Sequence, residues 1–94
     1  MTKIRYALID NNSGYVFGVV DASNPVEAAK ILDQKIGDGS REYEEAGRPD
    51  FSNETGYHVY HAPADFEVDD GQNEKEIAAV SALPKAGYVR SVEA

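Results

Sequence analysis

The two histidines of the chain are the side chains best suited to acid–base or metal chemistry near neutral pH. They are His58 and His61, and they lie in a stretch from Tyr57 to Ala62 whose aromatic and β-compatible residues predict a strand. Side chains alternate between the two faces of a strand, so the two rings should point to opposite sides and cannot easily hold one ion together. We therefore expect no metal site at this pair, and ordinary half-buried or surface roles for both rings.

An acidic run later in the chain has a spacing that is similar to that of a calcium-binding loop. The residues at positions 1, 3, 5, 9 and 12 of this run are Asp65, Glu67, Asp69, Asn73 and Glu76. The sharp turn of such a loop needs glycine at position 6, but this chain has Asp70 there, and Gly71 comes one residue late. The run therefore predicts a polar turn and no metal site.

The chain carries no sequence motif of a known catalytic or nucleotide-binding site. It lacks the G-x-S-x-G elbow, the Walker loop, the dinucleotide glycine pattern and the H-E-x-x-H zinc motif. It also has no cysteine, which removes disulfides, thiolate catalysis and cysteine-ligated zinc. We expect a protein that is not an enzyme, with no catalytic residue and no cofactor. The alternative is a small ligand-binding or enzymatic domain that uses His58 or His61 in a pocket.

Negative charge is concentrated in one part of the sequence. The net charge is −8, and residues 38–76 hold twelve acidic against three basic residues, whereas the remainder holds five against six. Such a field attracts basic surfaces and repels nucleic-acid phosphates, so we expect a contiguous acidic surface that binds a basic protein surface and no nucleic acid directly. The alternative is a solvated acidic face that aids solubility. The predicted partner-binding residues are Asp38, Glu42, Glu44, Glu45, Asp50, Glu54, Asp65, Glu67, Asp69 and Asp70.

Length and hydropathy indicate one small domain. Ninety-four residues, of which 41% are apolar, suffice for one core, so we expect a single domain over residues 1–94. The chain has no run of roughly 18 apolar residues that would span a membrane, and its first residues lack a secretory pattern. The prediction is a cytoplasmic monomer or weak homodimer without membrane contact, and the host-cell cytoplasm if the protein is phage-encoded.

The first third of the chain has the clearest pattern. Residues 3–10 and 15–22 flank Asn11-Asn12-Ser13-Gly14 and predict a β-hairpin. Asn24, Pro25 and Glu27 have the spacing of a helix start, which predicts a helix over residues 25–36 that packs on the hairpin. We expect one shared core made of Ile4, Tyr6, Leu8, Phe17, Val19, Ala28, Leu32 and Ile36.

The rest of the chain leaves several alternatives open. Residues 40–46 suit one helical turn or a short strand, and residues 66–69 either continue the strand at 57–62 or form a separate edge segment. Residues 73–83 suit a short helix that starts at Asn73, with a strand at 76–83 as the competing interpretation. Residues 88–92 predict a last strand. The fold class is α+β, a small antiparallel sheet with the main helix on one face and the order β-β-α-β-(α)-β.

Several short segments resemble a type I group of the small acidic anti-CRISPR proteins that phages and other mobile elements encode. The residues that carry the resemblance are Tyr6, Leu8-Ile9-Asp10, Asn12-Ser13-Gly14, Phe17, Asp21-Ala22, Ala28-Ala29, Glu54-Thr55-Gly56 and Tyr60-His61. They cover about the first 37 residues and a patch near residues 54–61. The resemblance implies inhibition without catalysis, in which the protein occupies a basic nucleic-acid-binding groove on a Cas effector subunit.

The sequence thus predicts a non-catalytic protein-binding inhibitor that docks an acidic surface on a basic partner. The acidic segment, with its nine net negative charges, is the feature on which this prediction depends. A bacterial regulatory or assembly subunit is a further alternative, because it would share the same charge and fold.

Overall fold

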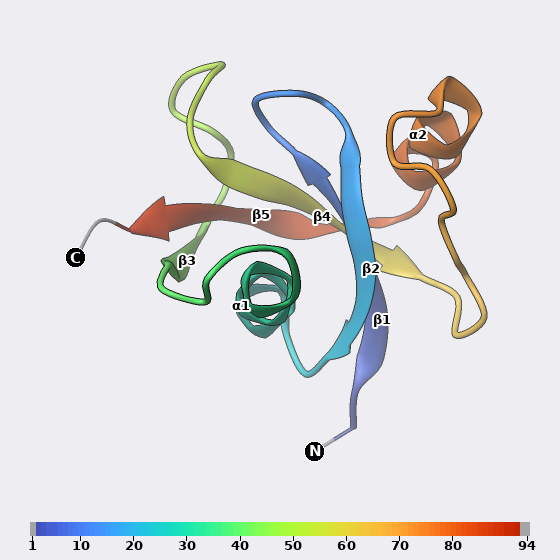
Figure 1. The fold of residues 1–94 in the computed structure, drawn as a ribbon, viewed down its shortest axis with the longest axis horizontal. Coiled ribbons are helices and arrows are strands. Elements are labelled where there is room, and N and C mark those ends of the chain that lie inside the picture. Colours follow the sequence, from blue (N-terminus) through green and yellow to red (C-terminus); the bar gives the residue numbers. More distant parts are fainter. Residues whose placement is uncertain (1, 93–94) are drawn as a thin grey trace.

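The computed structural model describes residues 2–92, which form five strands and two helices (Figure 1). The α+β class, the N-terminal hairpin and the main helix are as predicted, and one further strand, β3, is added to the predicted order. The elements are β1 (Ile4–Asp10), β2 (Val16–Ala22), α1 (Pro25–Ile36), β3 (Glu42–Ala46), β4 (Gly56–Ala62), α2 (Glu74–Ser81) and β5 (Lys85–Val92).

All neighbouring strands of the sheet are antiparallel, in the order β2-β1-β4-β5-β3. Within residues 2–92, β2 and β3 are therefore its two edges. The β2 edge is partly covered, because the Val16 N–H donates to the Gly71 carbonyl at 2.9 Å in the loop between β4 and α2. Strand β3 forms the other edge of the sheet. It is five residues long and rich in glutamate.

The hairpin turn is held by Asp10. Its carboxylate accepts hydrogen bonds from the N–H and the hydroxyl of Ser13, both at 2.9 Å, and its carbonyl accepts the Gly14 N–H. Gly14 adopts a φ of 75°, a left-handed conformation that glycine reaches without a Cβ penalty. The polar stretch between β1 and β2 therefore closes as the sequence predicts.

Helix α1 begins at the predicted cap and covers one face of the sheet. Asn24 Oδ1 accepts the Glu27 N–H at 2.8 Å, and the Glu27 carboxylate accepts the N–H and hydroxyl of Ser23. The helix approaches β2 closely at Gly18, where an added Cβ would lie 2.7 Å from Leu32 Cδ1. This contact fixes how near α1 sits to the sheet.

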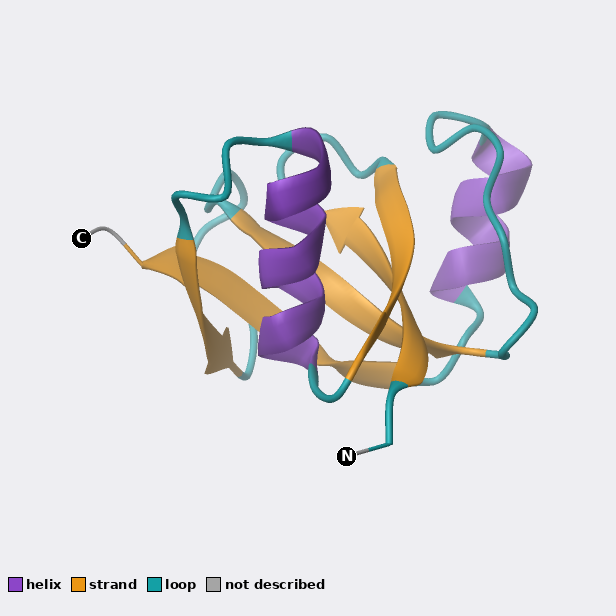
Figure 2. Cartoon of the chain, turned by 60° about the horizontal axis from the view of Figure 1, so that its bottom comes forward, coloured by secondary structure: helices purple, strands orange, loops and turns teal. Residues whose placement is uncertain are grey.

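Both faces of the sheet are covered. On one face, Leu8, Val20, Val59 and Val89 pack with Leu32 and its neighbours on α1. On the other face, Ala7, Ile9 and Val16 pack with Val80 of α2. Figure 2 shows α1 lying across the sheet and α2 at one end of it. Strand β1 is thus buried on both sides.

The predicted core shared by the hairpin and α1 is correct for four of its eight residues, a fifth lies in the other core, and three are exposed. Tyr6, Leu8, Ala28 and Leu32 are buried together beneath α1, whereas Val19 is partly buried on the opposite face, against the α2 side of the core. The three exceptions stay exposed, with Ile4 at 41%, Phe17 at 39% and Ile36 at 58%. Ile4 begins β1, Ile36 ends α1, and a register irregularity near Leu8 and Ile9 displaces the start of β2, so none of the three reaches the packed centre.

The structure decides between the alternatives for residues 40–46, 66–69 and 73–83. Residues 42–46 form a strand, residues 74–81 form a helix capped by Asn73, and the last strand begins at Lys85, three residues before the predicted start. Residues 66–69 form a loop and no strand, although Phe66 and Val68 pack against the α2 side of the core. Neither of the two helices in the described part of the chain is long and apolar enough to cross a membrane.

Candidate functional site

The ten predicted partner-binding carboxylates fall into two groups at opposite edges of the sheet (Figure 1). Asp38, Glu42, Glu44, Glu45, Asp50 and Glu54 lie on β3 and the loops beside it. Asp65, Glu67, Asp69 and Asp70 lie in the β4–α2 loop, which hydrogen-bonds to β1 and β2 through Arg5 and Val16. The fold divides the segment because residues 56–62 cross the sheet between the two groups, so the expected single contiguous surface is not formed along it.

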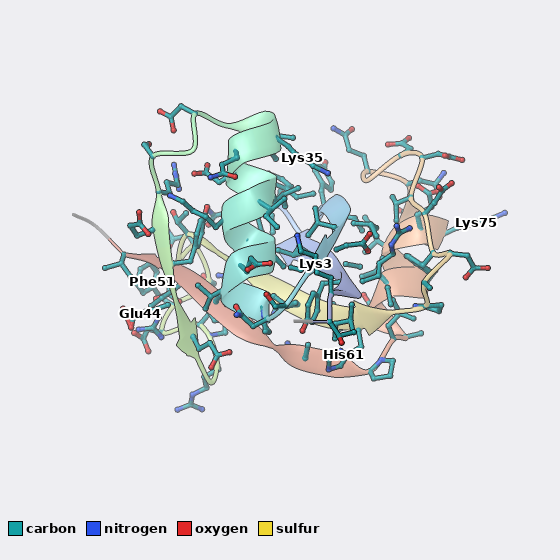
Figure 3. All side chains as sticks on the ribbon, turned by 90° about the horizontal axis from the view of Figure 1, so that it is seen from below. Lys3, Lys35, Glu44, Phe51, His61 and Lys75 are labelled. Carbon is teal, nitrogen blue, oxygen red and sulfur yellow. The ribbon has the colours of Figure 1, made fainter. Side chains whose placement is uncertain are left out.

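We call Glu42, Glu44 and Glu45 the β3 edge. All three are exposed, and Figure 3 shows Glu44 at the end of the molecule opposite Lys75 of α2. Glu42 pairs with Lys30 at 3.2 Å, whereas Glu44 and Glu45 make no ion pair within the described residues. The edge therefore retains uncompensated negative charge.

Glu54 is the exception among the ten, because it is buried with only 7% of its surface exposed. Its Oε2 accepts hydrogen bonds from the Tyr88 hydroxyl at 3.0 Å and from the Asp50 N–H at 3.3 Å. A buried carboxylate needs such donors, since burial without them is costly. Glu54 thus makes its hydrogen bonds inside the protein, and its carboxylate is not exposed on the surface.

Arg90 lies close to two of the carboxylates near β3, those of Asp50 and Glu54. Its Nη1 donates to Asp50 at 2.8 Å, and its Nη2 donates to the Arg48 carbonyl. Its Nε is buried and lies 3.5 Å from Glu54 Oε1 without forming a hydrogen bond to the described residues. Glu44 is the cross-strand neighbour of Arg90, so one guanidinium stands among three carboxylates and the negative excess persists.

The run with calcium-like spacing is the loop that leads into α2, and only its last three residues belong to the helix. The Glu76 carboxylate accepts the N–H groups of Asp69 and Asp70 at 3.0 and 2.6 Å, and Asn73 Oδ1 accepts those of Lys75 and Glu76. Asn73 thus satisfies backbone donors at the helix N-terminus, and Glu76 satisfies those of the loop before it. Residues 2–92 contain no group of three His, Cys, Asp or Glu side chains that could hold a metal ion.

The two histidines lie on opposite faces of β4, as the alternation predicts. His61 is exposed and stacks on Tyr6 of the α1 face, with ring centroids 5.5 Å apart. On the other face, His58 Nδ1 lies 2.9 Å from Lys85 Nζ and Nε2 lies 3.0 Å from Asn11 Oδ1. Because an ammonium only donates, Nδ1 is the acceptor and Nε2–H donates to Asn11. Burial, and then the nearby Lys85 charge, lower the pKa of His58 and so favour the neutral ring.

Three exposed apolar side chains form a feature that the sequence interpretation missed. Tyr15, Phe17 and Ile36 line one surface hollow together with Asp69 and Asp70, and Phe17 and Ile36 also line a second hollow beside Asp38. The spacing of Phe17 and Ile36 fits the apolar faces of β2 and α1 and therefore predicts core positions for both. The turn just before β2 and Gly37 directly after Ile36 are the only sequence signals that place these side chains at the ends of their elements.

The comparisons with known proteins found no match. No family model, no curated protein and no solved structure is similar to the chain at a significant level. The exposed side chains and their charges therefore have to indicate the function by themselves.

Proposed function

We propose that this protein is a non-catalytic binding protein that occupies a basic surface on a protein partner, of the kind that holds nucleic acid on a CRISPR effector subunit. The observation that carries the proposal is the β3 edge, where Glu42, Glu44 and Glu45 are all exposed and two of them make no ion pair with any residue from 2 to 92. This is the arrangement that a Lys- or Arg-rich groove would recognise.

Two of the four cations near the β3 edge, Lys30 and Arg90, are already engaged, whereas the exposed Arg41 and Arg48 make no ion pair within the described residues. Lys30 donates to the carbonyls of Gly39 and Arg41 as well as to Glu42, and Arg90 pairs with Asp50. The six carboxylates on and beside β3 outnumber the four cations, so the net charge of this part of the surface is negative. An exposed negative edge attracts a cationic partner over about 8–10 Å at ordinary salt, and more salt screens that attraction.

The β3 edge favours side-chain contacts over strand addition. An open edge strand can pair with another chain, but a short strand that carries several charges discourages such pairing. With five residues and three glutamates, β3 is of this protected kind. We therefore place the contact on the carboxylates and not on the free backbone groups of β3.

A salt-dependent pull-down tests the proposal against simple solubilisation. The bait is the intact chain, and the lysate comes from a bacterium that expresses a type I CRISPR effector complex. We expect the wild-type chain to retain the complex at low salt and to release it at high salt, because the contact is electrostatic. The triple variant E42Q/E44Q/E45Q should retain much less of it.

A matched variant controls for net charge. D65N/E67Q/E74Q also removes three exposed carboxylates, from the opposite side of the sheet, and should retain the complex as the wild type does. Equal loss in both variants would mean that only overall charge matters. If the wild-type chain does not retain the complex at low salt, the CRISPR effector complex is not its partner.

No observation favours the alternative of a ligand-binding or enzymatic site at a histidine. None of the hollows described for residues 2–92 is lined by His58 or His61. Both ring nitrogens of His58 are engaged, by Asn11 and Lys85.

A further inference from the structure

An apolar patch lies between the two groups of carboxylates, where the start of β2 meets the end of α1. It consists of Tyr15, Phe17 and Ile36, which expose 41%, 39% and 58% of their surfaces. The Phe17 ring is held against Tyr57 with centroids 5.5 Å apart, so it is fixed in place before any partner arrives. Isolated exposed apolar residues are ordinary, but three side by side on a small acidic domain mark a contact surface.

Two hollows flank the apolar patch. One, of about 280 Å³, lies between the patch and the acidic residues Asp69 and Asp70. The other, of about 630 Å³, extends from Phe17 and Ile36 to the opposite side, where Asp38 stands at its rim. Phe17 and Ile36 line both hollows, so they form the ridge between them.

The charge around the patch is strongly one-sided. The residues that line the two hollows include five carboxylates, those of Asp10, Asp33, Asp38, Asp69 and Asp70, against the single guanidinium of Arg41. The Asp33 carboxylate is partly engaged, because its Oδ2 accepts the Arg41 N–H. Asp69 and Asp70 make no ion pair within the described residues. The apolar ridge is thus bordered by negative charge on two sides.

We infer that this patch is the docking site for a basic amphipathic segment of a partner protein. Apolar side chains of that segment would cover Phe17 and Ile36, while its Lys and Arg side chains would face Asp38 on one side and Asp69 and Asp70 on the other. The inference rests on the proposed function, because it supplies the apolar anchor for a basic partner. An apolar centre within a charged rim is the usual anatomy of a specific protein contact.

The negative charge around the patch also disfavours binding of a second copy of the chain or of a nucleic acid. A second copy of this chain would bring the same carboxylates against each other, which costs free energy wherever like charges meet. A nucleic acid would add its phosphates to that repulsion. A segment with apolar and cationic side chains is complementary to both the ridge and its borders.

The test uses a synthetic peptide as the probe. It is a fluorescein-labelled helix of about 18 residues, or five turns, that carries leucines on one face and lysines on the other. Two matched peptides replace every leucine by serine, or every lysine by glutamate. The leucine–lysine peptide should bind the intact protein and shift the amide NMR signals of residues lining the two hollows. Both matched peptides should bind much more weakly.

Variants of the protein locate the contact. Phe17→Ser and Ile36→Ser should each weaken peptide binding by about tenfold, the effect expected for a central apolar residue of an interface. Phe51→Ser is the control, since Phe51 is 57% exposed but lies on the β3–β4 loop, and it should leave binding unchanged. Ile36 ends its helix and is the more exposed of the pair, so its variant should fold even where Phe17→Ser is destabilised.

Each outcome separates this inference from the proposed function. Equal binding of the serine-substituted peptide, or NMR shifts confined to residues 42–46, would overturn docking at the apolar patch and leave the β3 edge as the binding surface. Self-association that Ile36→Ser abolishes would overturn it in favour of a second copy. If the peptide binds at the patch, and the β3 edge variant retains the effector complex as well as the wild type does, the apolar patch is a binding surface and the β3 edge is not.

Discussion

The Tyr88 hydroxyl donates a 3.0 Å hydrogen bond to Glu54 Oε2 in the interior of the protein. Tyr88 is 1% exposed, and this bond ties the loop before β4 to the centre of β5. Burial, followed by the hydrogen bond to Glu54, raises the pKa of Tyr88 above its ordinary value of 10.0, so the hydroxyl keeps its proton at physiological pH. The pair explains why one acidic residue of the chain belongs to the core.

Replacing Tyr88 by phenylalanine should destabilise the fold. The substitution keeps the ring but leaves the Glu54 carboxylate with one donor fewer in a buried place, which costs about 1–3 kcal/mol. Urea denaturation followed by circular dichroism measures the loss. Tyr60→Phe is the control, because the Tyr60 hydroxyl makes no hydrogen bond within the described residues, and its unfolding midpoint should match the wild type. An unchanged midpoint for Tyr88→Phe would mean that the bond contributes nothing.

Gly56 should not tolerate a side chain, because it packs directly against Tyr88. A Cβ at this position would overlap the Tyr88 hydroxyl and the Val89 carbonyl, and the carbonyl is backbone that cannot move aside. We expect Gly56→Ala to lower the free energy of unfolding by about 3 kcal/mol, as overpacking does. Gly47→Ala has open space around its Cβ and should change stability by less than about 0.5 kcal/mol. Equal effects of the two variants in thermal melts would contradict this account.

Local patterns made the hairpin and α1 predictable. The polar turn at residues 11–14 and the Asn24 cap act through bonds between residues close in sequence, so they can be recognised without knowing the fold. The sequence alone does not decide strand β3, because its pairing with β5 joins residues far apart in the chain, and pairing determines whether so short a segment is a strand. The same holds for α2, whose burial of Val80 depends on the far face of the sheet.

The candidate site was predictable in composition but not in layout. Nine of the ten acidic residues are exposed, as the charge pattern suggests, yet β4 separates them into two groups. Glu54 could not be recognised as buried, because its partner Tyr88 lies 34 residues away. Phe17 and Ile36 have the spacing of core residues, and only the end of α1 and the irregular register of β1 and β2 leave them exposed.

Acidification should remove the contribution of His58 to stability. The folded-state pKa of His58 lies below its ordinary value of 6.5, first because the ring is buried and second because Lys85 is near. The unfolded chain therefore binds the proton more readily, so the contribution is complete above pH 6.5 and is lost as the pH falls through the folded-state pKa. We expect the free energy of unfolding, relative to His58→Gln, to be smaller at about pH 5 than at about pH 7.5.

A second variant tests the cause of this pH dependence. Lys85→Met removes the nearby positive charge and the donor to Nδ1, so the His58 pKa should rise toward 6.5 in an NMR titration of the ring. The pH-dependent difference from the corresponding double variant with His58→Gln should shrink accordingly. A wild-type protein whose stability follows that of His58→Gln at every pH would show that His58 is not coupled to folding.

The two surfaces should affect different rate constants of association. Charge on the β3 edge acts at a distance and steers the encounter, so E42Q/E44Q/E45Q should slow association with the leucine–lysine peptide by about three- to tenfold at low salt. The apolar patch acts only after contact, so Ile36→Ser should raise the dissociation rate by about tenfold and change association by less than about twofold. Stopped-flow fluorescence measures both rates. High salt screens the steering, and the association rates of the wild type and the β3 edge variant should then converge. If both variants alter the same rate constant, or if their rates fail to converge at high salt, the division of labour between the β3 edge and the apolar patch does not hold.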